Sequence, residues 1–306
     1  AMNQLPPLSL GTGLVQFRFL YMPSRNLAKK TQEEYTRDVE DLVGFLKNRG
    51  IEEWSQVGLE HLQAYMAYLE GQALKITTRN RKAYAIKTFF KYLVGGGYVI
   101  DNAAEALIPP KIPKQEPRFL TTAEYTALLD QITDTRDKAV VMLFLQAGLL
   151  LSELAKLEMD DVQLPDQVAK DAEHVGMIKV ERKDASEEYL PLNWKACEAL
   201  RAWFVERRNK LREKATSTQA VFVNKFGESI SARSIQRMVK KYLEQAGIED
   251  ASVHTLRHTM ATHYVAKGGD IKSIQEMLDH ANLGTTQGYL ELAKKAQIQM
   301  VQNLAL

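Results

Sequence analysis

The sequence predicts a mainly α-helical protein of two domains, with one small β-hairpin in the second domain. Its 306 residues are more than a single hydrophobic core usually organises. Apolar residues recur at three- and four-residue spacing through most of the chain, which is the helical period. Two stretches break that pattern: a proline-rich segment at 109–118 and a strand-like segment at 174–192. The first is the predicted domain boundary and the second the predicted hairpin.

Composition excludes several classes of protein. The chain is 45% hydrophobic and 25% charged, as in ordinary globular proteins. Nothing approaches 18 consecutive apolar residues, so we expect no membrane span. The start, AMNQLPPLSLG, lacks the features of a signal peptide, and Ala1 before Met2 resembles a cloning scar. The single cysteine, Cys197, rules out a disulfide framework and favours a reducing cytoplasm.

The first domain is expected to be helical over residues 20–108, after a flexible N-terminus at 1–19. A capping box at Thr31-Gln-Glu-Glu34 predicts the start of its first helix, which Gly50 ends. A second helix is predicted from about Leu59 to Glu70. The third opens at Thr77 or Thr78 and runs to the glycines at 95–97, and the short segment DNAAEAL follows it.

The stretch PPKIPKQEPR, residues 109–118, predicts a stiff and extended linker, because it has four prolines and three basic residues. A second domain, 119–306, follows. LTTAEYTALLDQI reads as a capped helix, and RDKAVVMLFLQAGLLLSELAKLEMDDV as one or two buried helices. The runs MIKV and EYLPL, on either side of KDASE, predict the hairpin. Helices are expected from Lys195 to the end.

The third helix of the first domain is predicted to be basic on its outward positions. With the basic linker behind it, such a helix is typical of a protein that contacts the phosphate backbone of DNA. A solvated helix face with no ligand would show the same pattern. The residues concerned are Arg79, Arg81, Lys82, Lys87 and Lys91.

Histidines give the next signal, since four of the six fall between His254 and His280. His254 and Arg257 are three residues apart and share a helix face, which suits an anion such as a phosphate. His254 and His258 are four apart, a spacing that a metal pair could use. Nearby carboxylates do not fall at ligand spacing, so we predict no metal. Histidines that only satisfy core hydrogen bonds remain an alternative.

The segment HTLRHTMATHYVAKGGDIKSIQEMLDHANLGTTQGYLELA resembles the second half of the signature of the tyrosine site-specific recombinases, the phage integrase family, in their compact Xer-type form. His254 and Arg257 match the family's H-x-x-R box. His280, in LDHANL, matches its His/Trp position, although Asp279 stands where glycine is usual. Tyr289, in TTQGY, matches the nucleophile. The hairpin VERKDASEEYLPL is similar to the family's turn and brings Lys183 to the position of its lysine.

The resemblance covers about residues 20–295 and implies the fold. It implies a helical core-binding (SAM-like) domain, followed by an α+β catalytic domain of the tyrosine-recombinase type. The implied partners are a duplex DNA recombination site and three further copies of the chain, a homotetramer on two sites, with or without an accessory protein. No cofactor and no membrane are implied, and the family serves mobile elements as well as chromosomes.

The resemblance also implies a role for each matched side chain. Tyr289 would attack a phosphodiester and form a 3′-phosphotyrosyl link. A phenol with a pKa of about 10 needs help to lose its proton, and His254 is one candidate to take it. Arg257 would hold the nonbridging oxygens, and His280 would donate to them. Lys183 would protonate the departing 5′ oxygen.

One position departs from the family pattern. GLLLSELAKLEMDDV is similar to the family's G-L-R-x-S-E-L-x-x-L-x-x-x-D-V, and Leu150 stands where the first catalytic arginine is expected. By analogy with oxyanion-hole deletions, losing such a donor costs on the order of 10²–10³ in rate. Three readings stay open: Arg182 substitutes in the assembled complex, the leucine was engineered to trap a DNA complex, or the chain binds and synapses DNA without cutting it. A metal-dependent hydrolase that uses the histidines is a further alternative.

The tail KKAQIQMVQNLAL is expected to form a helix. Ile298, Val301 and Leu304 recur at three-residue spacing and give it one apolar stripe. We predict that this stripe docks on a neighbouring protomer. The alternative is that the tail packs on its own domain.

Overall fold

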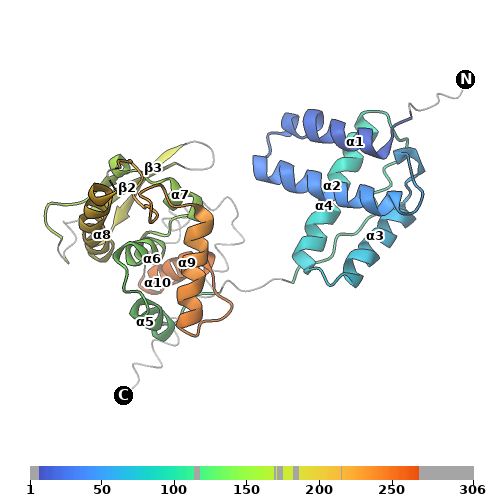
Figure 1. Ribbon diagram of the computed structural model, residues 1–306. Coiled ribbons are helices and arrows are strands. Elements are labelled where there is room, and N and C mark those ends of the chain that lie inside the picture. The colour runs from blue at the N-terminus through green and yellow to red at the C-terminus, as the bar shows by residue number, and fades with distance from the viewer. Residues whose placement is uncertain are drawn as a thin grey trace, which may run out of the picture. The chain divides into compact units, whose positions relative to one another are not determined.

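The structure is a computed structural model of the whole chain, and it describes residues 7–113, 118–168, 170, 175–181, 186–214 and 216–268. The chain divides into two compact units, Ala1–Lys114 and Gln115–Leu306 (Figure 1). The division falls inside the proline-rich stretch. Each unit has its own hydrophobic core and is described by itself.

All the regular elements in the described part of the first unit are helices. Its helices α2 and α4 pack against each other, and the short helices gather around them (Figure 1). The elements are α1 (Leu10–Gln16), the π-helix η1 (Phe17–Tyr21), η2 (Pro23–Arg25), α2 (Lys29–Lys47), η3 (Trp54–Gln56), α3 (Leu59–Gly71) and α4 (Ile76–Gly95). The predicted second and third helices are therefore confirmed as α3 and α4.

The start of this unit is packed, and the prediction of a flexible segment over 1–19 is wrong from Leu8 onward. The Ser9 side chain caps α1 by accepting from the Thr12 N–H. Leu10 and Phe17 are buried, and the Trp54 indole N–H donates to the Leu10 carbonyl at 3.3 Å. These apolar side chains belong to the core rather than to a tail, because they bury their surface against α2 and α4.

The predicted capping box at Thr31–Glu34 is also wrong. Helix α2 begins at Lys29, so Thr31 lies inside its first turn. The side-chain amide of Gln32 donates instead to the Leu27 carbonyl at 2.7 Å, just before the helix. Gly50 lies beyond the helix end with a φ of 73°, the left-handed backbone that glycine adopts without strain.

The second unit combines helices with one three-stranded sheet. Its elements are α5 (Thr122–Asp130), α6 (Thr135–Ala147), α7 (Leu151–Lys156), η4 (Met159–Asp161), β1 (Val162–Gln163), β2 (Gly176–Glu181), β3 (Glu187–Leu192), α8 (Trp194–Glu213), α9 (Ala232–Gln245) and α10 (Val253–Ala266). The sheet is antiparallel in the order β1-β2-β3, with Lys179 opposite Tyr189. The predicted hairpin is thus confirmed, while β1 was missed because two residues make no periodic pattern.

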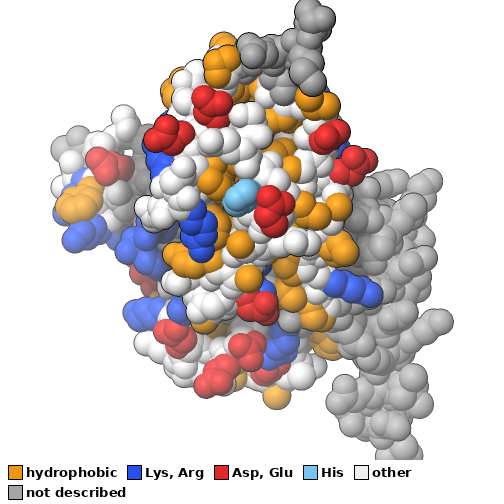
Figure 2. Space-filling model, turned by 90° about the vertical axis from the view of Figure 1, so that its right-hand side faces the viewer, with side chains coloured by type: hydrophobic (Ala, Val, Ile, Leu, Met, Phe, Trp, Pro, Cys, Tyr) orange, Lys and Arg blue, Asp and Glu red, His pale blue; other side chains and the backbone are white. Residues whose placement is uncertain are grey.

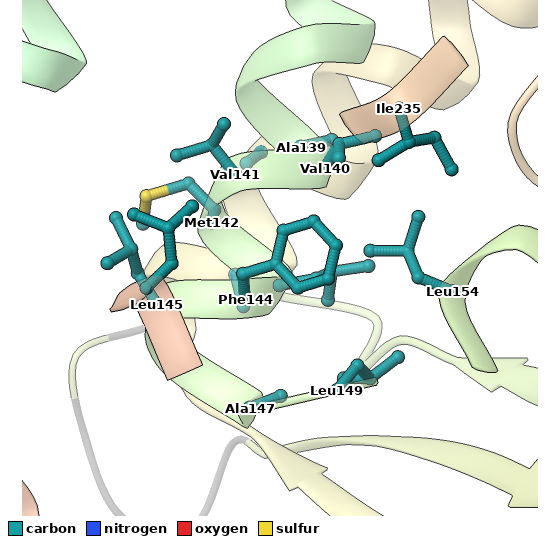
Figure 3. Close-up of a cluster of buried hydrophobic side chains, with 14 of the residues drawn as sticks. Ala139, Val140, Val141, Met142, Phe144, Leu145, Ala147, Leu149, Leu154 and Ile235 are labelled. Carbon is teal, nitrogen blue, oxygen red and sulfur yellow. The ribbon is translucent and has the colours of Figure 1, made fainter. Parts of the chain in front are cut away.

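Helix α6 is the centre of this unit and packs against α8 and α10. Its side chains are buried on all sides, which is why the sequence shows an almost continuous apolar run rather than a stripe. Figure 3 shows Phe144 of α6 facing Leu154 of α7, with Leu149 and Ala147 below them and Ile235 of α9 above. The core therefore reaches the turn between α6 and α7.

The helices expected from Lys195 onward are confirmed in the described residues as α8, α9 and α10, with irregular segments between them. Residues 216–231 are irregular, with a tight turn at 224–228, where the Asn224 side chain accepts hydrogen bonds from the Phe226 and Glu228 N–H groups and Gly227 has a φ of 83°. Residues after 268 lie outside the described part of the chain. Within the described part, no helix is long and apolar enough to cross a membrane.

Candidate active site and basic helix

The turn between α6 and α7 has a shape that its residue types dictate. Gly148 ends α6 with φ 65° and ψ 33°, and its N–H donates to the Leu143 carbonyl at 3.1 Å. Leu150 precedes α7 in extended backbone, and its N–H donates to the Glu153 carboxylate at 2.7 Å. Glu153 is itself buried. The glycine and glutamate of the GLLLSEL motif thus build a defined turn, with the half-buried Leu150 at its exit.

Helix α10 brings the other half of the motif to this turn. Arg257 is buried, and its Nη1 donates to the Gly148 carbonyl oxygen at 2.7 Å. His254 lies one helical turn earlier on α10 and is exposed. The helix is anchored near the linker by Thr259, whose hydroxyl accepts from the Leu120 N–H at 2.8 Å. Two stretches predicted to share one site, around Leu150 and around Arg257, therefore meet in the structure.

The side chains that meet near the α6–α7 turn include types that bind anions in proteins. A guanidinium has five donors, and the Gly148 carbonyl uses one of them to set the direction of the group. An exposed imidazole three residues before it adds a hydrogen-bond donor or a proton acceptor on the same helix face. A leucine at the third position adds apolar surface but no donor.

A second histidine of the cluster has a structural role. His263 is half-buried, and its ring lies 6.3 Å from the ring of Tyr125. Burial, followed by the charge of Lys267, lowers its pKa, so the imidazole is neutral near pH 7. Among the described residues no three side chains of metal-ligand type are grouped as a metal site would require.

Several predicted residues lie outside the described residues. They are Lys183, His280 and Tyr289, together with Arg182 and the tail at 294–306. Their roles remain predictions from the sequence. The strands that precede and follow Lys183 in sequence are described, and they pair over six residues each.

The basic helix α4 differs from its prediction at Lys82, which is not outward but 5% exposed. Its ammonium donates to Asp38 at 3.0 Å and to Asp41 at 2.5 Å, both on α2. Asp38 is only 1% exposed, and a carboxylate this deeply buried requires cationic partners. Lys82 therefore joins α2 to α4.

The two arginines of α4 also contact carboxylates. Arg81 Nη2 donates to Asp38 Oδ1 at 3.0 Å, and its Nη1 lies 3.3 Å from the Glu34 carboxylate. Arg79 pairs with Glu70 of α3 at 3.0 Å. Both groups are only partly exposed. Their charges are shared with neighbouring acids before any DNA is bound.

Lys87 and Lys91 complete the predicted set. The Lys87 ammonium donates to three backbone carbonyls, those of Ala104, Glu105 and Leu107, at 2.8–2.9 Å. It thereby caps the turns that follow α4. Lys91 is exposed. The face drawn in Figure 2 mixes basic, acidic and apolar side chains rather than gathering one sign of charge.

Sequence reasoning missed the partners rather than the motif residues. Asp38 and Asp41 lie more than forty residues from Lys82, and no local spacing links them. The Gly148 carbonyl that holds Arg257 is a backbone group, so residue type carries no signal for it. The available signal was one acidic residue, Asp38, among the apolar positions of the first predicted helix.

Comparison with known proteins identifies relatives of the whole chain. Residues 114–296 match the phage integrase family, and residues 14–97 match the phage integrase N-terminal SAM-like domain. The tyrosine recombinase XerC of Natranaerobius thermophilus is 32% identical over 299 residues, which cover 95% of this chain and 97% of that protein. The tyrosine recombinase XerC of Thermodesulfovibrio yellowstonii is 33% identical over 283 residues, 88% of each chain.

Solved structures share the fold. The XerH site-specific recombinase, bound to palindromic difH substrate in a post-cleavage complex, matches with a TM-score of 0.74 and 18% identity over 94% of this chain and 84% of that one. A lambda integrase tetramer bound to a Holliday junction matches with a TM-score of 0.72 and 16% identity over 92% and 77%. The helical first unit and the α+β second unit are thus those of this fold.

Proposed function

Because this chain belongs to the phage integrase family, the tyrosine recombinases that cleave and rejoin DNA, we propose that it exchanges strands at a specific duplex site through a 3′-phosphotyrosyl intermediate. Leu150 would slow that reaction without removing the rest of the machinery. The observation that carries the proposal is the meeting of Arg257 with the Gly148 carbonyl at 2.7 Å. This contact supports the proposal because it brings together the two segments that the family resemblance assigns to one site.

The proposed chemistry has two covalent steps, cleavage and rejoining, and each is one displacement at phosphorus. The Tyr289 oxygen attacks the phosphorus, the bond from phosphorus to the 5′ oxygen breaks, and Lys183 gives its proton to that oxygen. His254 takes the phenol proton, while Arg257 and His280 donate to the nonbridging oxygens. A 5′-hydroxyl from another strand then attacks the phosphotyrosine and releases the tyrosine. The bond energy stays in the link, so the balance needs neither ATP nor a metal.

The proposed assembly is a homotetramer on two duplex sites. The proposed location is the cytoplasm, where a DNA substrate is accessible. Two observations on relatives support it: XerH was solved on its difH substrate and lambda integrase as a tetramer on a Holliday junction. We propose further that the tail at 294–306 docks between protomers, because its apolar stripe needs a partner surface.

A second candidate function is favoured by Leu150 alone. A chain that lacks one phosphate-binding arginine could bind and synapse DNA with little or no cleavage. Arg257, His254 and the shape of the turn would then serve binding only. The two candidates differ in one measurable product, a covalent protein–DNA adduct.

The test begins by finding the site. Duplexes bound by the full chain are selected from a random library, and a nicked suicide version of the selected sequence is incubated with protein. We expect an adduct that is lost in Tyr289→Phe, while binding of the duplex stays within about twofold, since a phenol oxygen adds little to a ground-state contact surface. No adduct from the unmodified chain would favour the binding-only candidate. An adduct that persists in Tyr289→Phe would contradict the assignment of the nucleophile, and loss of cleavage in EDTA would favour a metal-dependent hydrolase.

A further inference from the structure

The side-chain amide of Gln146 connects three elements of the second unit. Gln146 is half-buried in the last turn of α6. Its Nε2 donates to the hydroxyl oxygen of Tyr125 on α5 at 2.8 Å, and its Oε1 accepts from the Asn193 amide at 2.6 Å. Tyr125 and Asn193 are 21 and 47 residues away in sequence. One side chain thus ties together segments that are joined by no local pattern.

Gln146 itself lies next to the candidate active site. Gln146 is two residues before Gly148, whose carbonyl accepts the hydrogen bond from Arg257. The left-handed backbone of Gly148 turns the chain sharply, so the position of its carbonyl depends on where the last turn of α6 is held. Gln146 is the last polar side chain before that turn.

The hydrogen bond between Gln146 and Asn193 lies at the base of the hairpin. Asn193 directly follows Leu192, the last residue of β3, and it is the N-cap of α8. Its Oδ1 accepts from the Ala196 N–H at 3.1 Å while its Nδ2 donates to Gln146. The two functions of one amide fix the point at which the hairpin joins the helix. A displacement of the end of α6 would therefore also displace the end of β3.

The surroundings show that this network contributes geometry more than stability. Tyr125, Gln146 and Asn193 line an open cavity of about 960 Å³, together with His263. Water can reach these groups, so a lost bond is replaced by a bond to water at little net cost in folding free energy. Burial raises the pKa of Tyr125, which keeps the phenol neutral and available as a hydrogen-bond partner.

We propose that Gln146 is a positioning residue for the reaction. Its amide holds the end of α6 and the base of the β2–β3 hairpin at a fixed separation, and so sets the Gly148 carbonyl that aims Arg257. The inference rests on the proposed function, since it assigns Gln146 a part in the same cleavage step. Small displacements matter here because a shift of about 1 Å at a reacting group can cost on the order of 10²-fold in rate.

Two substitutions separate positioning from packing. Gln146→Leu keeps the approximate volume and removes both hydrogen bonds. Gln146→Glu keeps both, because a carboxylate accepts from the Tyr125 hydroxyl and from the Asn193 amide. Gln245→Leu, at the exposed end of α9, is the matched control. Each full-length variant is measured for its melting temperature, for duplex binding, and for the single-turnover rate of adduct formation at saturating protein.

We expect Gln146→Leu to slow adduct formation at least about tenfold, and Gln146→Glu and Gln245→Leu to stay within about threefold of the unmodified chain. Binding and melting temperature should change little in all three. A Gln146→Leu protein with the unmodified rate, or a Gln146→Glu protein as slow as Gln146→Leu, would overturn the inference.

Failure of the proposed cleavage is distinguishable from failure of this inference. If the unmodified chain forms no adduct, amide hydrogen exchange of residues 148–152 and 193–196 gives the answer. Faster exchange in both segments in Gln146→Leu, but not in Gln146→Glu, supports the positioning role without any cleavage. Equal exchange in the two variants contradicts it.

Discussion

Lys82 of α4 and Arg257 of α10 are both cations with 5% of their surface exposed, one in each unit. Lys82 lies between two carboxylates of α2, at 3.0 Å from Asp38 and 2.5 Å from Asp41. Arg257 instead donates to the carbonyl of the turn where its family's motifs converge. The first cation holds two helices together, and the second holds α10 to the turn between α6 and α7.

The difference shows what residue type alone cannot tell. Both cations fall in helices, and both were predicted to contact phosphate. The prediction for Arg257 depended on the spacing of a motif that extends over two segments, whereas the prediction for Lys82 depended on charge in one helix. Charge in one helix does not reveal which side of that helix is covered. The spacing of a motif does indicate the side, because the motif requires residues from several segments to lie together.

The largest expected effect is on stability, at Lys82. Lys82→Met leaves the Asp38 carboxylate buried beside fewer cations, and breaking a buried ion pair from one side costs about 3–5 kcal/mol. Urea denaturation of the full chain should show the first unit unfolding at a much lower midpoint. The double variant Lys82→Met with Asp38→Leu should recover most of the loss, since it replaces the pair by apolar groups. A loss below about 1 kcal/mol in the single variant would mean that Lys82 is not structural.

The next effect is on rate, at Arg257. Arg257→Lys keeps the charge and removes the planar fork, and we expect adduct formation to fall by about 10²–10³, as when one donor to a transition state is deleted. The control is Arg207→Lys in α8, a cation that is 8% exposed and that also donates to backbone carbonyls, those of Thr218 and Ala220. Its substitution should lower the melting temperature and leave the rate at saturating DNA unchanged. Equal losses of rate in the two variants would place Arg257 among the structural cations.

These expectations also show how far the sequence predicts this molecule. The helices α3 to α8, the hairpin and the Thr121–Glu124 capping box follow from periodicity and turn residues, because those signals are local. The burial of Leu8 and Leu10, the strand β1 and the turns around Asn224 did not, because tertiary packing decides them. At the site, motif spacing correctly predicted that the segment around Gly148 and Leu150 meets the segment around Arg257. Backbone groups and distant acids such as Asp38 carry no signal that a single sequence displays.

A smaller effect is expected at Leu150, the position that separates the two candidate functions. Leu150→Arg should raise the single-turnover cleavage rate at least tenfold, which corresponds to ~1.4 kcal/mol of transition-state stabilisation. Affinity for the duplex should change far less than the rate. The half-buried Leu150 side chain gives the alternative, in which the site has repacked and an unpaired arginine destabilises it. A melting temperature lower by several degrees with no gain in rate would favour that alternative.

The smallest effect concerns Lys91, the exposed member of the α4 set. If exposed cations of this helix contact phosphates while buried ones only hold the fold, Lys91→Ala should weaken duplex binding by a similar factor for every sequence. It should also reduce the slope of log affinity against log salt by about 0.9, the value of one phosphate contact. Lys91→Arg keeps the charge and should keep the slope. Titrations between about 50 and 200 mM salt, the range over which such losses are large, measure this slope directly.

A slope that Lys91→Ala leaves unchanged would remove α4 from the phosphate contacts altogether, because its other cations already have partners within the first unit. The basic residues of α4 would then only stabilise the first unit, and the phosphate contacts would have to come from cations outside α4.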